Sequence, residues 1–294
     1  MALSIRKLHS SFGGEVGPID LMKVVDEGEL AEIRNAMDDY AVLVFRDQHF
    51  DNDEQAAFAE RLDGQLHTKT GTATLQKNRF DNEAISDISN VDAEGHLLDA
   101  NDRKRLFGLA NRLWHADASF QNPAGRYSML SARIVPPVPA DTQFADMRAA
   151  YDALSDEMKA RLAGLKVHHS IAYSRQRLGF ALSEEEEAKL EGAYHPLIRS
   201  FPGSGRKSLY LASHASMIVD WPVPEGRMLL QELVEHATQP QFVFSHRWRV
   251  GDLVIWDNRT TMHRATAFDD KTYVRDMRRV TTLDVDRAER SKVA

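Results

Sequence analysis

The spacing of apolar residues along the chain predicts helices that alternate with short strands. Apolar residues recur at helical spacing between positions 30 and 39, and the run AVLVF at 41–45 has the length of a buried strand. The sequence GRMLLQELVEHAT at 226–238 is amphipathic with the period of a helix. The same criteria predict further helices at 52–61, 147–154, 155–165 and 183–190. They predict further strands at 84–91, 127–135, 142–144, 208–212, 242–249, 253–256 and 278–283.

These elements predict one domain that spans residues 1–294, because no low-complexity linker divides the chain. The fold class that fits is mainly β with flanking helices, built on a double-stranded β-helix (a jelly roll of the cupin kind). Segments 65–105 and 168–191 are expected to supply active-site loops, and 92–108 has no clear period. The glycine-rich sequence PGSGRK at 202–207 lacks the spacing of a phosphate-binding loop, so we expect a hairpin turn there.

Composition narrows the chemistry that this chain can perform. With 37 basic and 44 acidic residues the net charge is −7, which disfavours nucleic acid and anionic membranes as partners. The chain has no cysteine, so disulfides, thiolate nucleophiles, iron–sulfur clusters and cysteine-bound zinc are excluded. No run approaches the roughly 18 apolar residues of a membrane span, and the N-terminal residues lack an apolar signal core. We therefore expect a cytoplasmic protein.

Two histidines and one aspartate are candidate metal ligands. In an extended segment residues two apart share a face, so His115 and Asp117 can bind one ion. A His-x-Asp pair alone is weak evidence, because it is common without a metal. His263 follows a predicted strand 146 residues later (263 − 117) and is the candidate third ligand. Two histidines and one carboxylate form the facial triad of non-haem Fe(II) oxygenases, which leaves positions open for a co-substrate and O2.

Two arginines near the end of the chain indicate acidic ligands. Arg275 and Arg279 are four residues apart and would share one face of a strand, whereas Arg278 would point to the outer face. Two guanidiniums in one pocket repel each other unless anions lie between them, and guanidinium binds carboxylate in a fork. One carboxylate would belong to 2-oxoglutarate and one to the substrate. The alternative is that these arginines form surface pairs with Asp276 or Asp284.

Taken together, these motifs resemble the TauD/TfdA family, the taurine and 2,4-dichlorophenoxyacetate dioxygenases that depend on Fe(II) and 2-oxoglutarate. The resemblance extends from AVLVFRDQ near residue 41 to RRVTTLD near 284, and it is closer to the phenoxyacetate branch. Its motifs are DISNV at 87–91, NRLWHADASF at 111–120, GRYSMLSA at 125–132, FADMRAAYDAL at 144–154, PGSGRKSLY at 202–210 and HRWRVGDLVIWDNR at 246–259.

The resemblance implies a role for each matching residue. His115, Asp117 and His263 match the iron ligands, and Arg275 with Thr142 match the partners of the distal carboxylate of 2-oxoglutarate. Substrate contacts are implied for Asn111, His169 and Arg279. The chain departs from the family in one place, since Pro139-Ala140 precedes Asp141-Thr142 where many members have Gly-Gly.

The function expected from the residues and the resemblance is hydroxylation of the ether-linked CH2 of an aryloxyacetate. The reaction would consume 2-oxoglutarate and O2 and give a phenol, glyoxylate, succinate and CO2. The alternatives are the same chemistry on taurine, another sulfonate, an alkyl sulfate or an aromatic acid, a zinc hydrolase, and a non-catalytic cupin-type binding protein. The expected partner is a small anionic organic acid, with neither nucleic acid nor membrane, and the resemblance implies a homo-oligomer.

Overall fold

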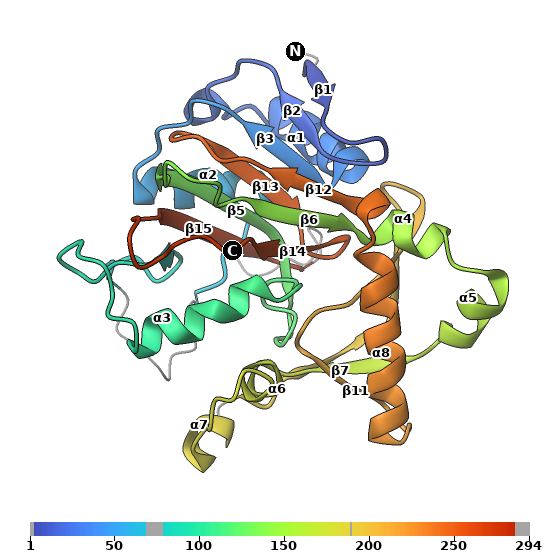
Figure 1. Ribbon diagram of the computed structural model, residues 1–294. Helices are drawn as coiled ribbons and strands as arrows, with labels where there is room; N and C mark the ends of the chain where they lie inside the picture. Colours follow the sequence, from blue (N-terminus) through green and yellow to red (C-terminus); the bar gives the residue numbers. More distant parts are fainter. Residues whose placement is uncertain (1–2, 69–78, 189, 286–294) are drawn as a thin grey trace.

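The largest sheet of the protein brings together strands from both ends of the chain. The computed structural model describes residues 3–68, 79–188 and 190–285, and Figure 1 shows their arrangement. The strands of this sheet, in spatial order, are β1 (Ile5–Lys7), β2 (Gly14–Val16), β3 (Val42–Phe45), β13 (Leu253–Asp257), β5 (Gly125–Ile134), β15 (Asp276–Leu283) and β4 (Ser86–Ser89). Its pairs are antiparallel except β2 with β3.

A smaller antiparallel sheet packs against the large one and completes a double sheet. Its strands are β12 (Val243–His246), β6 (Thr142–Asp146) and β14 (Thr261–Ala265). Phe144 of the small sheet belongs to the same buried cluster as Val254 and Trp256 of the large sheet. This arrangement agrees with the double-stranded β-helix that the sequence predicts.

Alternation along β3 explains how the large sheet is buried on both faces. Val42 and Val44 lie in the cluster between the sheets, whereas Leu43 and Phe45 lie on the other face. That second face is covered by α1 (Glu27–Tyr40) and α2 (Asn52–Asp63). Both helices begin at an aspartate cap, and Asp51 forms a complete capping box with Glu54.

A second group of elements lies between β6 and β12 in the chain, and part of it packs around α8 in Figure 1. Its helices are α4 (Met147–Asp152), α5 (Asp156–Leu162), α6 (Ile171–Gln176), α7 (Glu184–Ala188) and α8 (Val223–Ala237). Its strands are β7 (Lys166–His169), β8 (Ala193–Pro196), β9 (Ile198–Phe201), β10 (Arg206–Leu209) and β11 (Ala215–Ile218). The predicted hairpin turn at 202–207 is confirmed, because it joins β9 to β10.

Several short elements differ from the sequence prediction. The region 92–108, expected to be irregular, contains α3 (Arg103–Gly108), which is capped by Asp102 and continues into the 3-10 helix η2 (Leu109–Arg112). The prediction also missed the helix α6 and the 3-10 helices η1 (Leu21–Lys23) and η3 (Pro240–Phe242). The strands that it missed are β1, β2, β7, β8, β9, β11 and β14. Such elements are too short to show a period. In the described part of the chain, no helix is long and apolar enough to cross a membrane.

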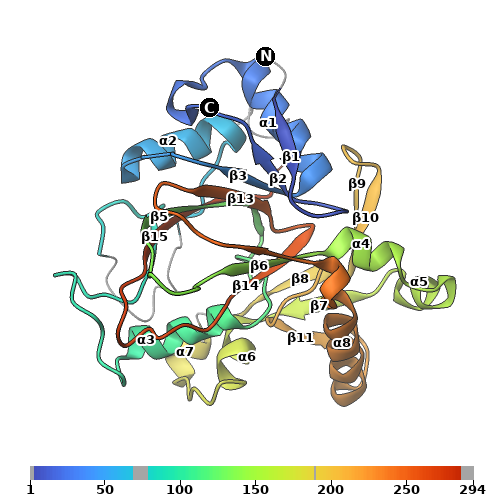
Figure 2. The same ribbon diagram turned by 45° about the horizontal axis from the view of Figure 1, so that its top comes forward.

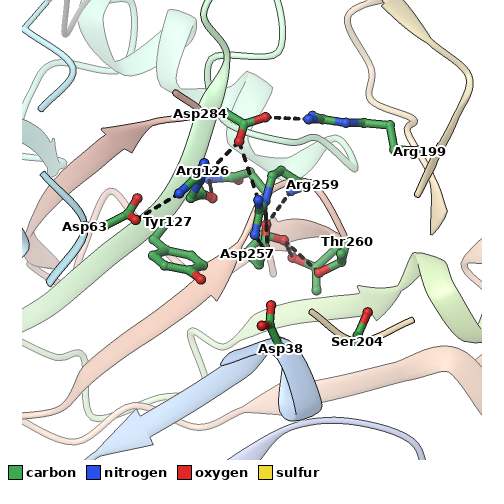
Figure 3. A network of polar contacts seen from close by, with 12 residues as sticks. Asp38, Asp63, Arg126, Tyr127, Arg199, Ser204, Asp257, Arg259, Thr260 and Asp284 are labelled. Carbon is green, nitrogen blue, oxygen red and sulfur yellow. Dashed lines mark hydrogen bonds and ion pairs between the residues drawn. The ribbon is translucent and has the colours of Figure 1, made fainter. Parts of the chain in front are cut away.

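A partly buried charge network fixes the turn between β13 and β14 (Figure 3). Asp257 accepts hydrogen bonds from the backbone and side chain of Arg259. Asp284, just after β15, forms ion pairs with Arg259, with Arg126 of β5 and with Arg199 of β9. The turn therefore presents Asn258 in a fixed place, and Asn258 contacts the site described next.

Candidate active site

Backbone pairing brings the three predicted metal ligands together. His115 follows η2 and forms a two-way backbone bridge with His263 of β14, with N–O distances of 3.0 and 2.8 Å. Potential ligand atoms of His115, Asp117 and His263 all lie within 4.8 Å of one another. The Nε2 atoms of His115 and His263 lie 3.7 and 3.6 Å from the two carboxylate oxygens of Asp117. All three side chains are buried, so a metal ion would be well shielded from water.

The protonation states of these side chains suit a divalent cation. His115 Nδ1 lies 2.8 Å from the carbonyl of Leu113, which can only accept, so Nδ1 carries the proton and Nε2 is free to bind metal. Burial lowers the pKa of both His115 and His263, which keeps the imidazoles neutral. Two neutral imidazoles and one carboxylate fit Fe(II) in the facial-triad arrangement.

Asp117 is held by hydrogen bonds at both carboxylate oxygens. Ser128 Oγ of β5 donates to Oδ2 at 2.7 Å, and Arg279 Nη1 donates to Oδ1. The backbone N–H of Asp117 donates to Asn258 Oδ1 at 2.9 Å, while Asn258 Nδ2 donates to Ser128 Oγ. Burial alone would raise the pKa of Asp117, but the positive charge of Arg279 and the hydrogen bond from Ser128 oppose it, and the pKa lies well below its usual range. The carboxylate is therefore ionised and fixed in position.

A cavity of about 160 Å³ opens beside the ligands. Its lining includes His115, His263, Thr142, Arg275 and Arg279. Arg275 is buried, burial lowers its pKa to about 10, and its guanidinium has no ion-pair partner among the described residues. Thr142 Oγ1 accepts a hydrogen bond from Trp248 Nε1 at 3.0 Å, so its own proton stays available for another acceptor. A hydroxyl donor and an unpaired guanidinium together suit a carboxylate.

Comparisons with known proteins agree with this geometry. The family described as "Taurine catabolism dioxygenase TauD, TfdA family" matches residues 4–281. The chain belongs to the TauD/TfdA family.

Relatives within the family match over nearly their whole length. The chain is 46% identical over 284 residues to an alpha-ketoglutarate-dependent 2,4-dichlorophenoxyacetate dioxygenase of Burkholderia sp. (strain RASC), covering 96% of this chain and 95% of that protein. It is 45% identical to the enzyme of that name from Cupriavidus pinatubonensis, and the match covers 97% of this chain and 99% of that protein. This chain also resembles the protein in a crystal structure of AAD-2 in complex with Mn(II) and N-oxalylglycine, with a TM-score of 0.92 and 45% sequence identity. The match covers 97% of this chain and 99% of that one. The fold is thus that of the TauD/TfdA double-stranded β-helix enzymes.

The structure separates the predicted substrate contacts into two groups. Asn111 and Arg279 line the cavity. His169 is fully buried behind it, where Nδ1 lies 3.1 Å from Ser119 Oγ, and the same hydroxyl lies 3.0 Å from His214 Nδ1. His214 in turn packs edge-on against His115, with ring centroids 6.2 Å apart. The prediction of direct substrate contact stays a prediction for all three residues.

Sequence reasoning missed the residues that hold Asp117. Ser128 lies 11 positions from Asp117 and Asn258 lies 141 away, and their contacts depend on strand pairing. The motif WDNR contains Asn258, yet its side chain gave no separate indication of a role. Arg278 has the opposite parity to Arg279, as expected, but it is buried and paired with Asp276.

Proposed function

We propose that this chain hydroxylates the ether-linked CH2 of an aryloxyacetate such as 2,4-dichlorophenoxyacetate, with 2-oxoglutarate and O2 as co-substrates. The hydroxylated product is a hemiacetal, which breaks to a phenol and glyoxylate, while 2-oxoglutarate yields succinate and CO2. Support for the substrate class comes from the relatives of that name at 45–46% identity. The observation that carries the reaction type is the buried triad beside an unpaired Arg275 in one cavity.

His115, Asp117 and His263 would hold Fe(II), which supplies the oxidising chemistry with O2 and 2-oxoglutarate. The protein would orient 2-oxoglutarate and the organic acid next to the metal. Arg275, which directly precedes β15, and Thr142 of β6 would bind the distal carboxylate of 2-oxoglutarate, and both side chains line the cavity. Thr142 pairs with Ala265, two residues after His263, so this carboxylate would be anchored close to the iron ligands.

The other side chains of the cavity orient the organic acid and exclude water. Arg279 lines the cavity beside Asp117 and would attract the acidic group of the substrate. Trp256, Leu130, Phe268 and Leu109 supply apolar surface suited to an aryl ring. Fixing both ends of the substrate presents its CH2 to the metal.

The same chemistry on another anionic substrate is the main alternative. An alkylsulfatase of Acinetobacter baylyi is 27% identical to this chain over 272 residues. This identity is well below the 45–46% of the phenoxyacetate enzymes. A non-catalytic binding protein or a zinc hydrolase would leave Arg275 and Thr142 without a role.

The test compares substrates on the Fe(II)-loaded enzyme. Succinate formation is measured with 2,4-dichlorophenoxyacetate, phenoxyacetate, taurine and an alkyl sulfate, and the organic product is identified in each case. We expect the aryloxyacetates to give the highest kcat/KM, with release of the phenol. A higher kcat/KM for taurine or the alkyl sulfate would replace the proposed substrate class while keeping the reaction type.

A further inference from the structure

Asn90 is a side chain of the candidate site that the proposed function has not used. It belongs to the motif DISNV at 87–91, lines the same cavity as Arg275, and is only 8% exposed. Its Nδ2 donates to the carbonyls of Asp270 and Tyr273, at 2.8 Å each. Its Oδ1 accepts the backbone N–H of Arg275, also at 2.8 Å. Because a carbonyl only accepts and an N–H only donates, these contacts allow one orientation of the amide.

The place of Asn90 follows from the pairing of β4 with β15. In that pair Ser89 lies opposite Asp276, so Asn90 and Arg275 form the next pair along the chain. The N–H of Asn90 donates to the carbonyl of Arg275 at 3.2 Å, which continues the ladder. The carbonyl of Asn90 accepts the N–H of Leu98 instead, and Oδ1 replaces it as the acceptor for Arg275. Asn90 therefore holds the backbone of Arg275 at both its N–H and its carbonyl.

The segment 266–275, between β14 and β15, has no regular secondary structure and depends on such contacts for its shape. Much of it is exposed, including Lys271 and Thr272. On one side the carboxylate of Asp270 pairs with Arg105 of α3 at 2.9 Å, and Figure 2 shows the segment running alongside this helix. On the other side the buried Asn90 binds the carbonyls of residues 270 and 273. One asparagine thus anchors the part of the segment that leads into Arg275.

The guanidinium of Arg275 has no comparable anchor of its own. The side chain is buried and lines the cavity, and no hydrogen bond or ion pair holds the guanidinium among the described residues. Its place is therefore set by the backbone from which it extends. A guanidinium binds a carboxylate as a fork only when the two groups are placed to within roughly 0.5 Å. A shift of the Arg275 backbone would misplace the guanidinium by more than this tolerance.

We propose that Asn90 is a positioning residue for the co-substrate, because it fixes Arg275 where the guanidinium meets the distal carboxylate of 2-oxoglutarate. The proposal rests on the role proposed above for Arg275. Asn90 acts through the backbone of Arg275 and needs no contact with the co-substrate. A 2-oxo acid bound at the triad has one end fixed there, so the place of Arg275 selects the length of the acid. Asn90 therefore contributes both to affinity for 2-oxoglutarate and to its preference over a longer acid.

The experiment measures equilibrium binding of three 2-oxo acids to Mn(II)-loaded protein, without turnover, by calorimetric titration. 2-Oxoglutarate carries the distal carboxylate, 2-oxoadipate is longer by one CH2, and pyruvate has no distal carboxylate. The weak affinity for pyruvate is measured by competition with N-oxalylglycine. Asn90→Ala should weaken binding of 2-oxoglutarate roughly tenfold to hundredfold, reduce its preference over 2-oxoadipate, and leave pyruvate within about twofold. A general disturbance of the site would weaken all three acids alike.

A double substitution shows whether Asn90 acts through Arg275. Arg275→Met should itself weaken binding of 2-oxoglutarate, because it removes the partner of the distal carboxylate. Since both changes remove the same interaction, Asn90→Ala should weaken binding by less than about twofold further in the Arg275→Met protein. Effects that multiply, as those of independent sites do, would overturn the proposal.

Asn82→Ala is the matched control for the loss of an asparagine near β4. Asn82 Nδ2 donates to Asp53 at 3.0 Å and Oδ1 accepts the N–H of Ala84 at 3.0 Å, and Asn82 does not line the cavity. This variant should bind all three acids as the wild type does. If Asn90→Ala does not fold, Asn90→Ser, a smaller change that keeps a hydroxyl, is measured with the same expectations. Wild-type affinity for 2-oxoglutarate in the Asn90 variant, or equal losses for 2-oxoglutarate and pyruvate, overturns the proposal.

Failure of the proposed function gives a different result. If Arg275→Met binds 2-oxoglutarate as the wild type does, the role proposed for Arg275 is wrong, and the role of Asn90 is wrong with it. If Arg275→Met weakens binding and Asn90→Ala does not, the inference about Asn90 alone is overturned. The titrations contain no organic substrate, so their outcome is independent of the proposed aryloxyacetate class.

Discussion

Asp117 and Arg275 show how one site uses charged side chains in two ways. Asp117 is fully engaged, since both carboxylate oxygens and the backbone N–H have partners inside the protein. Arg275 is buried but has no ion-pair partner among the described residues. The first arrangement would fix a metal ligand, and the second would leave a charge available for a ligand that arrives from solution. Each arrangement predicts the effect of a single substitution.

Ser128→Ala should weaken binding of the metal while the fold survives. The variant removes the donor to Asp117 Oδ2 and loosens the carboxylate, so we expect about tenfold to hundredfold lower affinity for Mn(II) or Fe(II). Ser131→Ala is the matched control, because Ser131 is buried on the same strand and donates to Gln55 away from the ligands. The affinity of each variant for the metal is measured by calorimetric titration. Equal affinities in the two variants would contradict the role given to Ser128.

Arg275→Met and Arg279→Met should separate the two acids of the reaction. In the first variant a charge-assisted pair with the distal carboxylate is lost, so the co-substrate 2-oxoglutarate should show a KM raised roughly tenfold to hundredfold. In the second variant the organic substrate should be the acid whose KM rises most. Steady-state kinetics with each acid varied in turn gives both constants. If both variants affected the organic substrate alone, the assignment of Arg275 would be wrong.

At the scale of elements, α3 forms a wall of the cavity and is tied down by ion pairs at its side. Lys104 pairs with Asp87 at 2.8 Å, and Arg105 pairs with Asp270 at 2.9 Å. Arg103, at the start of the helix, pairs with Glu186 but is half exposed. Partly buried pairs contribute more than exposed ones, so Arg105 should matter most for holding the wall in place.

Arg105→Ala should increase local opening of α3. We expect faster amide hydrogen exchange in residues 103–112 and weaker apparent affinity for the organic substrate, with little change for the co-substrate. Arg103→Ala removes an exposed pair from the same helix and should change exchange much less. Hydrogen exchange followed by mass spectrometry measures the exchange rates of residues 103–112 in both variants. Identical exchange in the two variants would show that the Arg105–Asp270 pair does not hold the wall.

Element by element, the sequence was most informative where a local pattern controls the structure. α1, α2 and α8 follow clear helical periods, β3 is an unbroken apolar run, and β13 is apolar up to its last residue, Asp257. The three metal ligands were predicted from spacing and residue type. The short strands β7, β8 and β11 have three or four pairing residues each, too few for a period. Ser128 and Asn258 could not be assigned because their roles arise only when distant strands pair.

At the scale of the whole molecule, the fold buries several histidines in neutral form. Burial lowers the pKa of His67 and His195, and it holds the pKa of His169 and His214 well below the ordinary value. The unfolded chain has ordinary histidines, which protonate below about pH 6.5. The unfolded state therefore takes up more protons as the pH falls. The homo-oligomer and the cytoplasmic location expected from the sequence stay predictions.

The metal-free protein should accordingly lose stability in mild acid. The stabilisation from neutral burial is fully present above about pH 6.5, and it decreases as the pH falls toward the lower pKa values of the folded state. We expect the free energy of unfolding, measured in urea, to fall between about pH 7.5 and about pH 5.5. His169→Gln should show a shallower decrease, since one titrating group is gone. Stability that stays constant or rises over this interval would contradict the neutral burial of these histidines.

Turnover by the iron-loaded protein tests the central claim most directly. The protein is loaded anaerobically with Fe(II), given 2-oxoglutarate and 2,4-dichlorophenoxyacetate, and exposed to air. The amounts of succinate, phenol and glyoxylate formed are then measured. We expect equal amounts of the three products from the wild type and none from His115→Ala, which should remain folded. Absence of succinate from wild-type protein with iron demonstrably bound would contradict the proposed reaction and favour a binding protein.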